Sequence, residues 1–226
     1  EQALAWVIDD DPLHLELSDT DPDAETRIRQ RYALLTLRFQ STIPWNRTQR
    51  WATGADECKW KGVACSKDVV TKLNVYENSV HGHLSADIPL LSSLTELGVA
   101  RNQLTGSIPS SVGQLTNLEK FYIDNNELTG SIPSSIGHCT DLETAYLARN
   151  NFTASLPSSI GQLSKLKKFY IDKNELTGSI PSSIGNCTDL EIAYLAWNKF
   201  TGSLPSSIGQ LSKLKQFAVD NNKFTG

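Results

Sequence analysis

No run of apolar residues in this sequence approaches the roughly 20 that an α-helix needs to cross a bilayer. We therefore expect any membrane attachment to depend on a segment beyond residue 226. The first residue is Glu1 rather than Met, so we expect a secretion signal to have been removed or to lie outside this sequence.

An excess of basic residues dense enough to bind nucleic acid is also lacking. Residues 1–25 contain nine of the 25 acidic residues and no Lys or Arg, which leaves 21 basic and 16 acidic residues in the rest of the chain. Nucleic-acid binding needs a dense stripe of basic side chains, and this mild balance does not provide one. We therefore expect no nucleic-acid partner.

Motifs of catalysis and cofactor binding are missing as well. The sequence has no G-x-S-x-G, no Cys–His pairing typical of a nucleophile and no glycine-rich phosphate loop. His81 and His83 have no acidic or Cys ligand at a spacing that suits a metal. We predict that the protein is not an enzyme and binds neither a metal nor a cofactor.

What the sequence does contain is a repeat. The stretch NELTGSIPSSIG runs from Asn126 to Gly137 and returns unchanged from Asn174 to Gly185. Residues 121–168 and 169–216 agree at 41 of 48 positions, so the sequence also has a longer repeat of 48 residues. An Asn recurs every 24 residues and defines seven units, here called rungs and named by that residue: Asn78, Asn102, Asn126, Asn150, Asn174, Asn198 and Asn222.

Each rung is predicted to contain one short strand. Leu97 and Val99, two residues apart, indicate a strand with one buried face. Pro109 and Gly113 then predict a turn and a short 3₁₀ segment. A single rung cannot bury its apolar side alone, so the rungs must stack. An inward Asn would bond the backbone groups that each turn leaves free, so we assign the Asn column a structural role.

The pattern LxxLxLxxNxLTGxIPxxIG over residues 69–226 resembles the leucine-rich repeat, in the variant found in extracellular proteins and receptor ectodomains of plants and microalgae. The resemblance implies an α/β repeat solenoid, a right-handed horseshoe or superhelix with a parallel sheet on its concave side. It also implies a second strand in each Thr-Gly-Ser-Ile-Pro segment. A partner would face the outward residues of the concave strands.

Residues 26–68 are predicted to cap the open N-terminal end of the solenoid. The segment TRIRQRYALLTLRF has an apolar helical face, and the pattern around Cys58, Trp60 and Cys65 resembles the plant-type N-terminal cap. The resemblance implies that Cys58 and Cys65 form a disulfide, and the cap sequence looks closer to diatom-type proteins than to land-plant receptors. Residues 1–25 form an acidic extension, predicted to pack on the cap or on lysines of the repeats or else to be a linker.

The four Cys residues allow three full pairings. Cys139 and Cys187 stand at the same offset two rungs apart, or about 10 Å at the usual strand spacing, beyond the roughly 7 Å Cα limit for a disulfide. We expect them to be free and buried. The implied disulfide and the N-glycosylation motifs at Asn46, Asn151 and Asn186 favour a secreted or cell-surface protein.

The predicted binding residues lie at fixed offsets before the rung Asn. Four residues before it, Tyr122, Tyr146, Tyr170 and Tyr194 form a column that is either a docking strip or a ladder that only stabilises the sheet. Two residues before it stand Asp124 and Asp172. One residue before it stand Arg149, Lys173 and Trp197, and we predict that Trp197 contacts a partner.

These features predict a non-catalytic module that binds a protein or peptide outside the cell, in recognition or adhesion, with a cell-wall polysaccharide as another partner class. A receptor-kinase ectodomain and a polygalacturonase inhibitor are alternatives that the resemblance implies. An ice-binding protein is a third, because a regular Thr column stands three residues after the Asn. The chain stops mid-rung, so we expect the natural protein to continue past Gly226.

Overall fold

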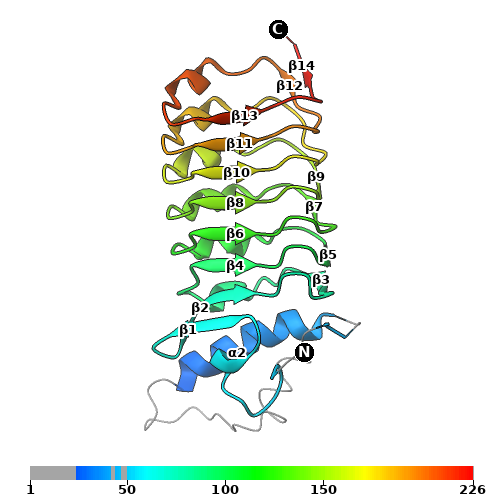
Figure 1. Cartoon of the computed structure of the whole chain (residues 1–226), viewed down its shortest axis with the longest axis vertical. Coiled ribbons are helices and arrows are strands. Elements are labelled where there is room, and N and C mark those ends of the chain that lie inside the picture. The colour runs from blue at the N-terminus through cyan, green and yellow to red at the C-terminus, as the bar shows by residue number, and fades with distance from the viewer. Residues whose placement is uncertain (1–23, 42–43, 47–49, 226) are drawn as a thin grey trace.

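The computed structural model describes residues 24–41, 44–46 and 50–225. Over these ranges the chain winds into one elongated solenoid, and helix α2 (Ala24–Phe39) lies across its N-terminal end (Figure 1). The acidic extension predicted for residues 1–25 falls almost entirely outside the described residues, so its packing stays a prediction.

The strands of successive rungs form one sheet along the solenoid. In the strand order β1–β2–β4–β6–β8–β10–β11–β13, the first pair is antiparallel and the others are parallel. Parallel partners lie 24 residues apart, as Phe121 and Ala145 do, so every rung contributes the same strand. The strands are β1 (Val63–Ser66), β2 (Val69–Asn74), β4 (Glu96–Gly98), β6 (Lys120–Tyr122), β8 (Thr144–Tyr146), β10 (Lys168–Tyr170), β11 (Ile192–Tyr194) and β13 (Gln216–Ala218).

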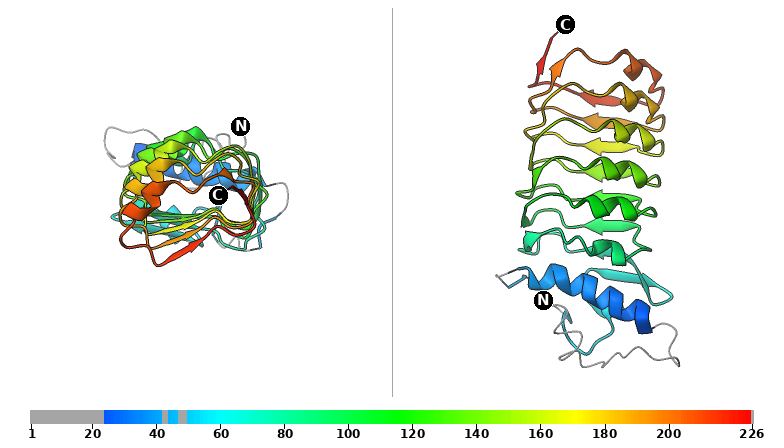
Figure 2. Two further views of the ribbon diagram at one scale, coloured as in Figure 1. Left: turned by 90° about the horizontal axis from the view of Figure 1, so that it is seen from above. Right: turned by 180° about the vertical axis from the view of Figure 1, so that it is seen from behind.

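Short 3₁₀ helices form the opposite side of the rungs (Figure 2). In the repeats after the first, each helix begins directly after a Pro, which suits this place because the first residues of a helix need no intrahelical N–H donor. The 3₁₀ segment predicted after Pro109 is confirmed. The helices are η2 (Glu57–Lys59), η3 (Ile88–Leu90), η4 (Ser110–Gln114), η5 (Ser134–His138), η6 (Ser158–Gln162), η7 (Ser182–Asn186) and η8 (Ser206–Gln210).

The second strand of each rung is shorter than the resemblance implied. Gly106 has a left-handed backbone (φ 74°) that turns the chain, and Pro109 has no N–H with which to extend a ladder. Ser107 and Ile108 therefore lie outside any strand. Short parallel pairs remain, namely β3 (His81–His83) with β5 (Gln103–Thr105), β7 (Thr129–Gly130) with β9 (Asn151–Phe152), and β12 (Thr201–Gly202) with β14 (Lys223–Phe224).

The recurrent Asn joins neighbouring rungs. The side-chain nitrogen of Asn126 donates to the Val99 carbonyl of the preceding rung and to the Ile123 carbonyl of its own, each at 3.0 Å. Its oxygen accepts from the Leu104 N–H at 3.0 Å. Each side chain thus satisfies backbone groups that the turn leaves free, as the sequence predicted. The pattern recurs at Asn150, Asn174, Asn198 and Asn222.

The core gives a physical reason for the repeat of two rungs. In the middle of the strands, Phe121 stands opposite the much smaller Ala145, and both are buried. The rung of Ala145 compensates with the buried Phe152, where the rung before has Leu128. Large and small side chains therefore alternate along the stack, which keeps the interior close-packed. The same exchange recurs with Phe169, Ala193, Phe200 and Leu176.

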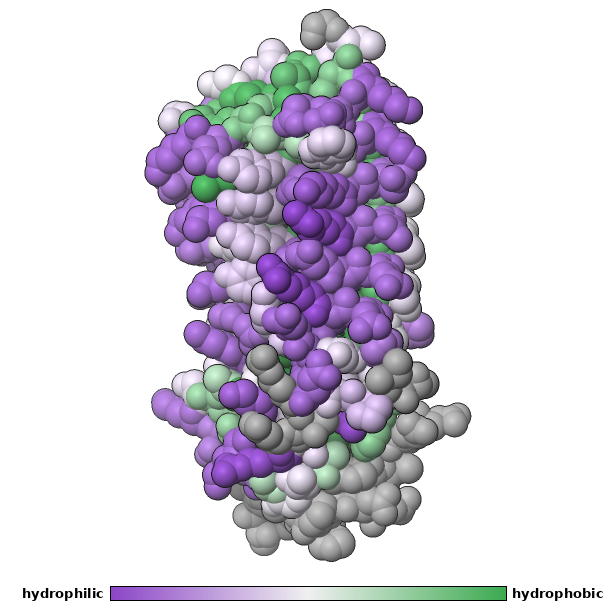
Figure 3. Space-filling model, turned by 45° about the vertical axis from the view of Figure 1, so that its right-hand side comes forward, coloured by the Kyte–Doolittle hydropathy of each residue, from purple (hydrophilic) through white to green (hydrophobic). Residues whose placement is uncertain are grey.

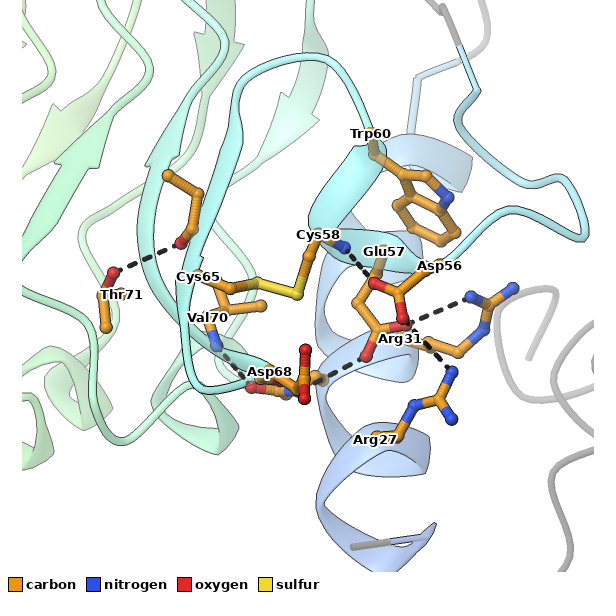
Figure 4. Close-up of a disulfide and its surroundings, with 12 residues drawn as sticks. Arg27, Arg31, Asp56, Glu57, Cys58, Trp60, Cys65, Asp68, Val70 and Thr71 are labelled. Atoms are coloured by element: carbon orange, nitrogen blue, oxygen red, sulfur yellow. Dashed lines mark hydrogen bonds and ion pairs between the residues drawn. A yellow bond between two sulfur atoms is a disulfide. The ribbon is translucent and has the colours of Figure 1, made fainter.

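A disulfide and a buried ion pair organise the cap (Figure 4). The disulfide joins Cys58 and Cys65, whose Cα atoms lie 5.5 Å apart. Arg31 of helix α2 pairs with Glu57 at 3.2 Å, and its guanidinium lies 4.9 Å from the centre of the Trp60 ring. Both charged side chains are almost completely buried, so each depends on the other to offset its loss of water.

Gln30 connects the capping helix to the sheet. Its side-chain oxygen accepts from the Val70 N–H at 2.6 Å, and its nitrogen donates to the Asp68 carbonyl at 3.2 Å. These bonds hold α2 against strand β2, and α2 thereby covers the apolar end of the first rung.

At the C-terminal end, apolar side chains gather on the surface (Figure 3). Leu204 is 42% exposed there, and Phe217, Val219 and Phe224 are only partly buried. They belong to the last described rungs, and no further described rung packs against them. Among the described helices, none is both long and apolar enough to span a bilayer.

Candidate ligand-binding face

The four predicted tyrosines form an unbroken row on the outer face of the sheet. Each ends a strand, and each lies between buried residues, because successive side chains of a strand point to opposite faces. The ring centres of successive tyrosines are 5.1, 4.4 and 4.8 Å apart, with the planes inclined by 63–74°. We call this surface the tyrosine face; it consists of Tyr122, Tyr146, Tyr170 and Tyr194.

The tyrosine rings are half-buried rather than fully exposed. Burial raises the pKa of Tyr122 above its ordinary value, and it does the same for Tyr170. The Tyr194 hydroxyl donates to the side-chain oxygen of Gln216 in the next rung. Edge-to-face rings hold one another in place, so the row presents a rigid surface with polar hydroxyl groups.

Carboxylates run beside the tyrosines on the same face. Asp124 and Asp172 lie two residues after Tyr122 and Tyr170, and Ala148 and Ala196 take this place in the rungs between. In the described part of the chain, no ion pair within 4.0 Å engages either Asp. Burial raises the pKa of Asp172, although the charges of Lys173 and Arg149 oppose that rise.

Charged and aromatic side chains border the carboxylates one residue further along. Arg149, Lys173 and Trp197 are exposed here, and all three have left-handed backbones with φ of 55–56°. Trp197 is 56% exposed and borders a groove of about 530 Å³ that Lys173, Glu175 and Asn151 also line. The structure therefore places the predicted Trp197 on the rim of the tyrosine face, beside a hollow.

A second hollow lies at the N-terminal end of the tyrosine row. Its volume is about 300 Å³, and it opens where Gly98 and Ala100 stand at the offsets of Tyr and Asp. A Cβ atom at position 98 would lie 3.1 Å from the Asn74 side chain, so a larger residue there would crowd Asn74. Tyr76, Arg101, Tyr122, Asp124 and Tyr146 line the rest.

Two family models match the chain. The one described as leucine rich repeat N-terminal domain matches residues 28–66, and the leucine rich repeat model matches residues 93–115, 117–139, 165–187 and 189–211. The chain is a leucine-rich repeat solenoid with a leucine-rich repeat N-terminal domain. A search of curated proteins gave no significant match. The closer likeness of the cap to diatom proteins stays a prediction.

Solved structures similar to this leucine-rich repeat solenoid include receptor-kinase ectodomains. That of GASSHO1/SCHENGEN3 from Arabidopsis thaliana, in complex with CASPARIAN STRIP INTEGRITY FACTOR 2, is 29% identical, with a TM-score of 0.74 over 86% of this chain and 27% of its own. That of Arabidopsis HAESA, in complex with an N-terminally extended IDA peptide hormone ligand, is 28% identical, with a TM-score of 0.58 over 85% of this chain and 41% of its own.

A third similar structure is that of Pollen Receptor Kinase 3. It is 25% identical, with a TM-score of 0.77 over 86% of this chain and 95% of its own. The leucine-rich repeat solenoid thus spans less than half of the first two ectodomains and almost all of the third.

The predicted glycosylation sites lie at three different places on the solenoid. Asn186 is exposed at the end of η7, and Asn46 lies by the cap, where its side chain donates to the Ser79 hydroxyl at 2.8 Å. Asn151 lies at the Trp197 groove. Their glycosylation stays a prediction, and the remainder of the Asn46 motif, at residues 47–48, falls outside the described residues.

The free cysteines and the threonines lie at different depths of the leucine-rich repeat solenoid. Cys139 and Cys187 are buried and unpaired, and burial raises their pKa values to about 11 and about 12.

The threonines three residues after the rung Asn are exposed in one column, next to the short second strands: Thr105, Thr129, Thr153, Thr177, Thr201 and Thr225. In the described ranges, no group of three or more His, Cys, Asp or Glu residues is placed to hold a metal.

The lysines predicted as a docking place for the acidic extension are Lys165, Lys167, Lys168, Lys213 and Lys215, and all but Lys168 form ion pairs in the described part of the chain. Lys165 pairs with Asp141 at 2.6 Å and Lys167 pairs with Glu143 at 2.8 Å, in each case one rung earlier. Lys213 and Lys215 repeat this arrangement with acidic residues of the preceding rung. Each of these four lysines thus forms a surface ion pair with the preceding rung.

Sequence reasoning missed the hollow at Gly98 and its neighbours Tyr76 and Arg101. Arg101 lies over the Tyr76 ring, with its guanidinium 5.6 Å from the ring centre. The signal that could have found this site was the break of the tyrosine column at Gly98.

Proposed function

We propose that this solenoid is an extracellular, non-catalytic binding module that recognises a protein or peptide through the tyrosine face. The observation that carries the proposal is the continuous row of four half-buried, edge-to-face tyrosines on an outer sheet face. Tyr side chains supply large contact area at low cost in conformational entropy and keep a hydroxyl for hydrogen bonding.

Two further findings support a peptide or protein partner outside the cell. The similar HAESA ectodomain was solved with a peptide hormone ligand, and the N-terminal domain of this chain contains a disulfide, typical of oxidising compartments. A row of hydroxyl-bearing rings open to solvent offers no enclosed, water-free space for catalysis, so we assign binding rather than chemistry to this surface.

Selection from a phage-displayed library of random 12-residue peptides tests the proposal. Peptides selected on the native protein should lose at least about ten-fold in affinity on the double variant Tyr146→Ala/Tyr170→Ala. Ala is a matched replacement, because Ala218 stands at the same offset in the last rung. A control double variant, Thr129→Ala/Thr177→Ala, changes exposed residues on another side and should bind normally.

Selected peptides that bind the tyrosine variant as well as the native protein would contradict this assignment and move the site elsewhere. Peptides that respond to Trp197→Asn but not to the tyrosine variant would place the site in the Trp197 groove. A cell-wall polysaccharide that binds the native protein and not the tyrosine variant would keep the face and change the partner class.

Whether the module acts as a receptor ectodomain, an inhibitor of a foreign polygalacturonase or an adhesion protein depends on its partner. Ice binding is the alternative from a different physical class, and the exposed, regular Thr column is the observation that favours it. Thr129→Ala/Thr177→Ala would then abolish faceting of ice crystals, whereas the tyrosine variant would leave faceting unchanged. If the native protein does not shape ice, this alternative fails.

A further inference from the structure

The carboxylates beside the tyrosine face repeat every two rungs. Asp124 and Asp172 are separated by Ala148, and the next Asp, Asp220, follows two rungs later. Successive rings are inclined by 63–74° to each other, so a given ring orientation recurs at every second rung at the earliest. The carboxylates therefore repeat every two rungs along the solenoid axis, and the inclined rings do not repeat at every rung.

This period can be compared with the repeats of a bound chain. The rings are 4.4–5.1 Å apart, in keeping with a strand spacing of about 4.8 Å, so two rungs span about 9.6 Å. A polyproline II helix rises about 3.1 Å per residue and turns every three residues, or about 9.3 Å. Its side chains on one edge would therefore stay in step with alternate rungs.

The other regular conformations do not stay in step. In an extended β-strand, side chains on one edge recur about every 6.8 Å, which matches neither one rung nor two. An α-helix has a pitch of about 5.4 Å, so over the three intervals between the four tyrosines it drifts by about 1.8 Å, or about 0.4 of a rung. The spacing of the face thus favours the polyproline II conformation.

The chemistry of the face favours the same partner. Aromatic-lined grooves are the usual receptors for proline-rich polyproline II segments, because the ligand is already ordered and lies flat on the rings. Asp124 and Asp172 form no ion pair within 4.0 Å in the described part of the chain. The hollow of about 300 Å³ beside Tyr122 offers space for a ring at the end of the row.

Basic residues on both sides restrict the charge pattern of the partner. Arg149 and Lys173 lie beyond the carboxylates, whereas Lys168 and Lys120, which pairs with Glu96 at 3.8 Å, lie two residues before the tyrosines. A densely cationic chain would meet repulsion from Arg149, Lys173 and Lys168. A peptide with one cationic side chain at every third residue would place its positive charges only against the line of carboxylates.

We infer that the tyrosine face binds a proline-rich peptide in the polyproline II conformation with a Lys or Arg at every third position. The inference rests on the proposed function and specifies its ligand class. The cationic side chains pair with Asp124, Asp172 and Asp220 at alternate rungs, and the prolines between them pack on the tyrosine rings.

Fluorescence anisotropy with four labelled 12-residue peptides tests this inference. The probes are (Pro-Pro-Lys)₄, (Pro-Pro-Gln)₄, (Pro-Pro-Glu)₄ and (Pro-Lys)₆, the last with more charge at the wrong spacing. (Pro-Pro-Lys)₄ should bind at least about five-fold more tightly than each of the others, and the difference should shrink as salt is raised.

Two protein variants make the test specific to the spacing. Asp124→Ala/Asp172→Ala, which copies Ala148 and Ala196 and leaves Asp220, should remove most of the difference in affinity between (Pro-Pro-Lys)₄ and (Pro-Pro-Gln)₄. Asp172→Ala/Ala148→Asp keeps the net charge but moves one carboxylate out of phase, and it should lower the affinity for (Pro-Pro-Lys)₄ about as much as removal of Asp172 alone.

The outcomes separate this inference from the proposed function. If (Pro-Pro-Glu)₄ or (Pro-Lys)₆ binds best, or if the out-of-phase variant binds (Pro-Pro-Lys)₄ normally, the inference is wrong. If no proline-rich probe binds while phage selection yields tyrosine-dependent peptides, the inference fails and the proposed function stands. If both experiments give nothing, both fail.

Discussion

Arg149 and Trp197 occupy equivalent positions two rungs apart, and both have left-handed backbones, with φ of 55° and 56°. This conformation disfavours most side chains and is tolerated best by Gly and Asn. Asn125 and Asn221 stand at the same offset in other rungs, so Asn is already compatible with this turn. Trp197 therefore adopts a backbone conformation that a bulky side chain disfavours.

Trp197→Asn should therefore raise the free energy of unfolding, by about 1 kcal/mol, because it relieves the left-handed Trp. Urea denaturation measures this effect. The selected peptides from the library should bind more weakly if Trp197 contacts them, although the fold is no less stable. A loss of more than about 1 kcal/mol would instead mean that the Trp ring packs on its neighbours and stabilises the rung.

Asn174→Ala should lower the free energy of unfolding by about 3 kcal/mol, since it removes a side chain that bonds two rungs. Its nitrogen donates to the Leu147 and Ile171 carbonyls at 3.1 and 3.0 Å, and its oxygen accepts from the Phe152 N–H at 3.0 Å. Asn222→Ala is the matched control, because that Asn makes equivalent bonds in a more exposed rung and should cost less. Equal losses would show that the bonds are insensitive to burial.

Arg31→Met should cost about 3–5 kcal/mol at neutral pH, because it leaves the buried Glu57 carboxylate without its guanidinium partner. Burial already raises the pKa of Glu57, and Arg31 opposes this rise. Without Arg31 the pKa in the folded state should be higher still. A raised folded pKa means that the folded protein binds the proton more tightly than the unfolded chain.

The loss caused by Arg31→Met should consequently be smallest at a pH below the ordinary range of Glu. It should grow as the pH rises through the raised pKa. Urea denaturation at several pH values checks the sign, and adding Glu57→Gln to the variant should remove the dependence. An equal loss at every pH would mean that Glu57 does not change its protonation in this range.

The thiols of Cys139 and Cys187 should not react with a thiol reagent in the native protein. Both are buried, and burial raises their pKa values to about 11 and about 12, so almost no thiolate is present at neutral pH. Titration of the unreduced protein in denaturant should find these two thiols, and prior reduction should reveal two more from Cys58 and Cys65. A fast-reacting thiol in the native state would contradict the burial.

Binding of (Pro-Pro-Lys)₄ should weaken as the pH falls, and the weakening should begin above the ordinary range of an Asp. Burial raises the pKa of Asp172, against the opposing charges of Arg149 and Lys173, and the nearby charge of Asp124 raises it further. The carboxylate that attracts a cation is therefore lost at a higher pH than usual. Asp172→Ala should shift the midpoint of the pH-dependent loss of binding to lower pH. An unshifted midpoint would mean that another group causes the pH dependence.

The 24-residue period fixed much of the architecture in advance. A rung that repeats without insertion must place equal offsets on equal faces, so the Asn column, the tyrosine column and the buried Cys139 follow from counting. The helix of the cap follows from the apolar face of its segment, whereas the disulfide is implied only by the resemblance to a known cap, because no local rule pairs Cys58 with Cys65. The second strands were overestimated, since glycine turns and prolines shorten them.

The sequence by itself determined which residues share a face, because each rung repeats the same backbone and side-chain directions alternate along a strand. Only the tertiary structure decided how those faces behave across rungs. Three features depend on how separate segments pack, which the repeat period does not specify. They are the inclination of the tyrosine rings, the hollow at Gly98 and the burial of Arg31 against Glu57. Contacts of that kind exist only after the rungs have stacked.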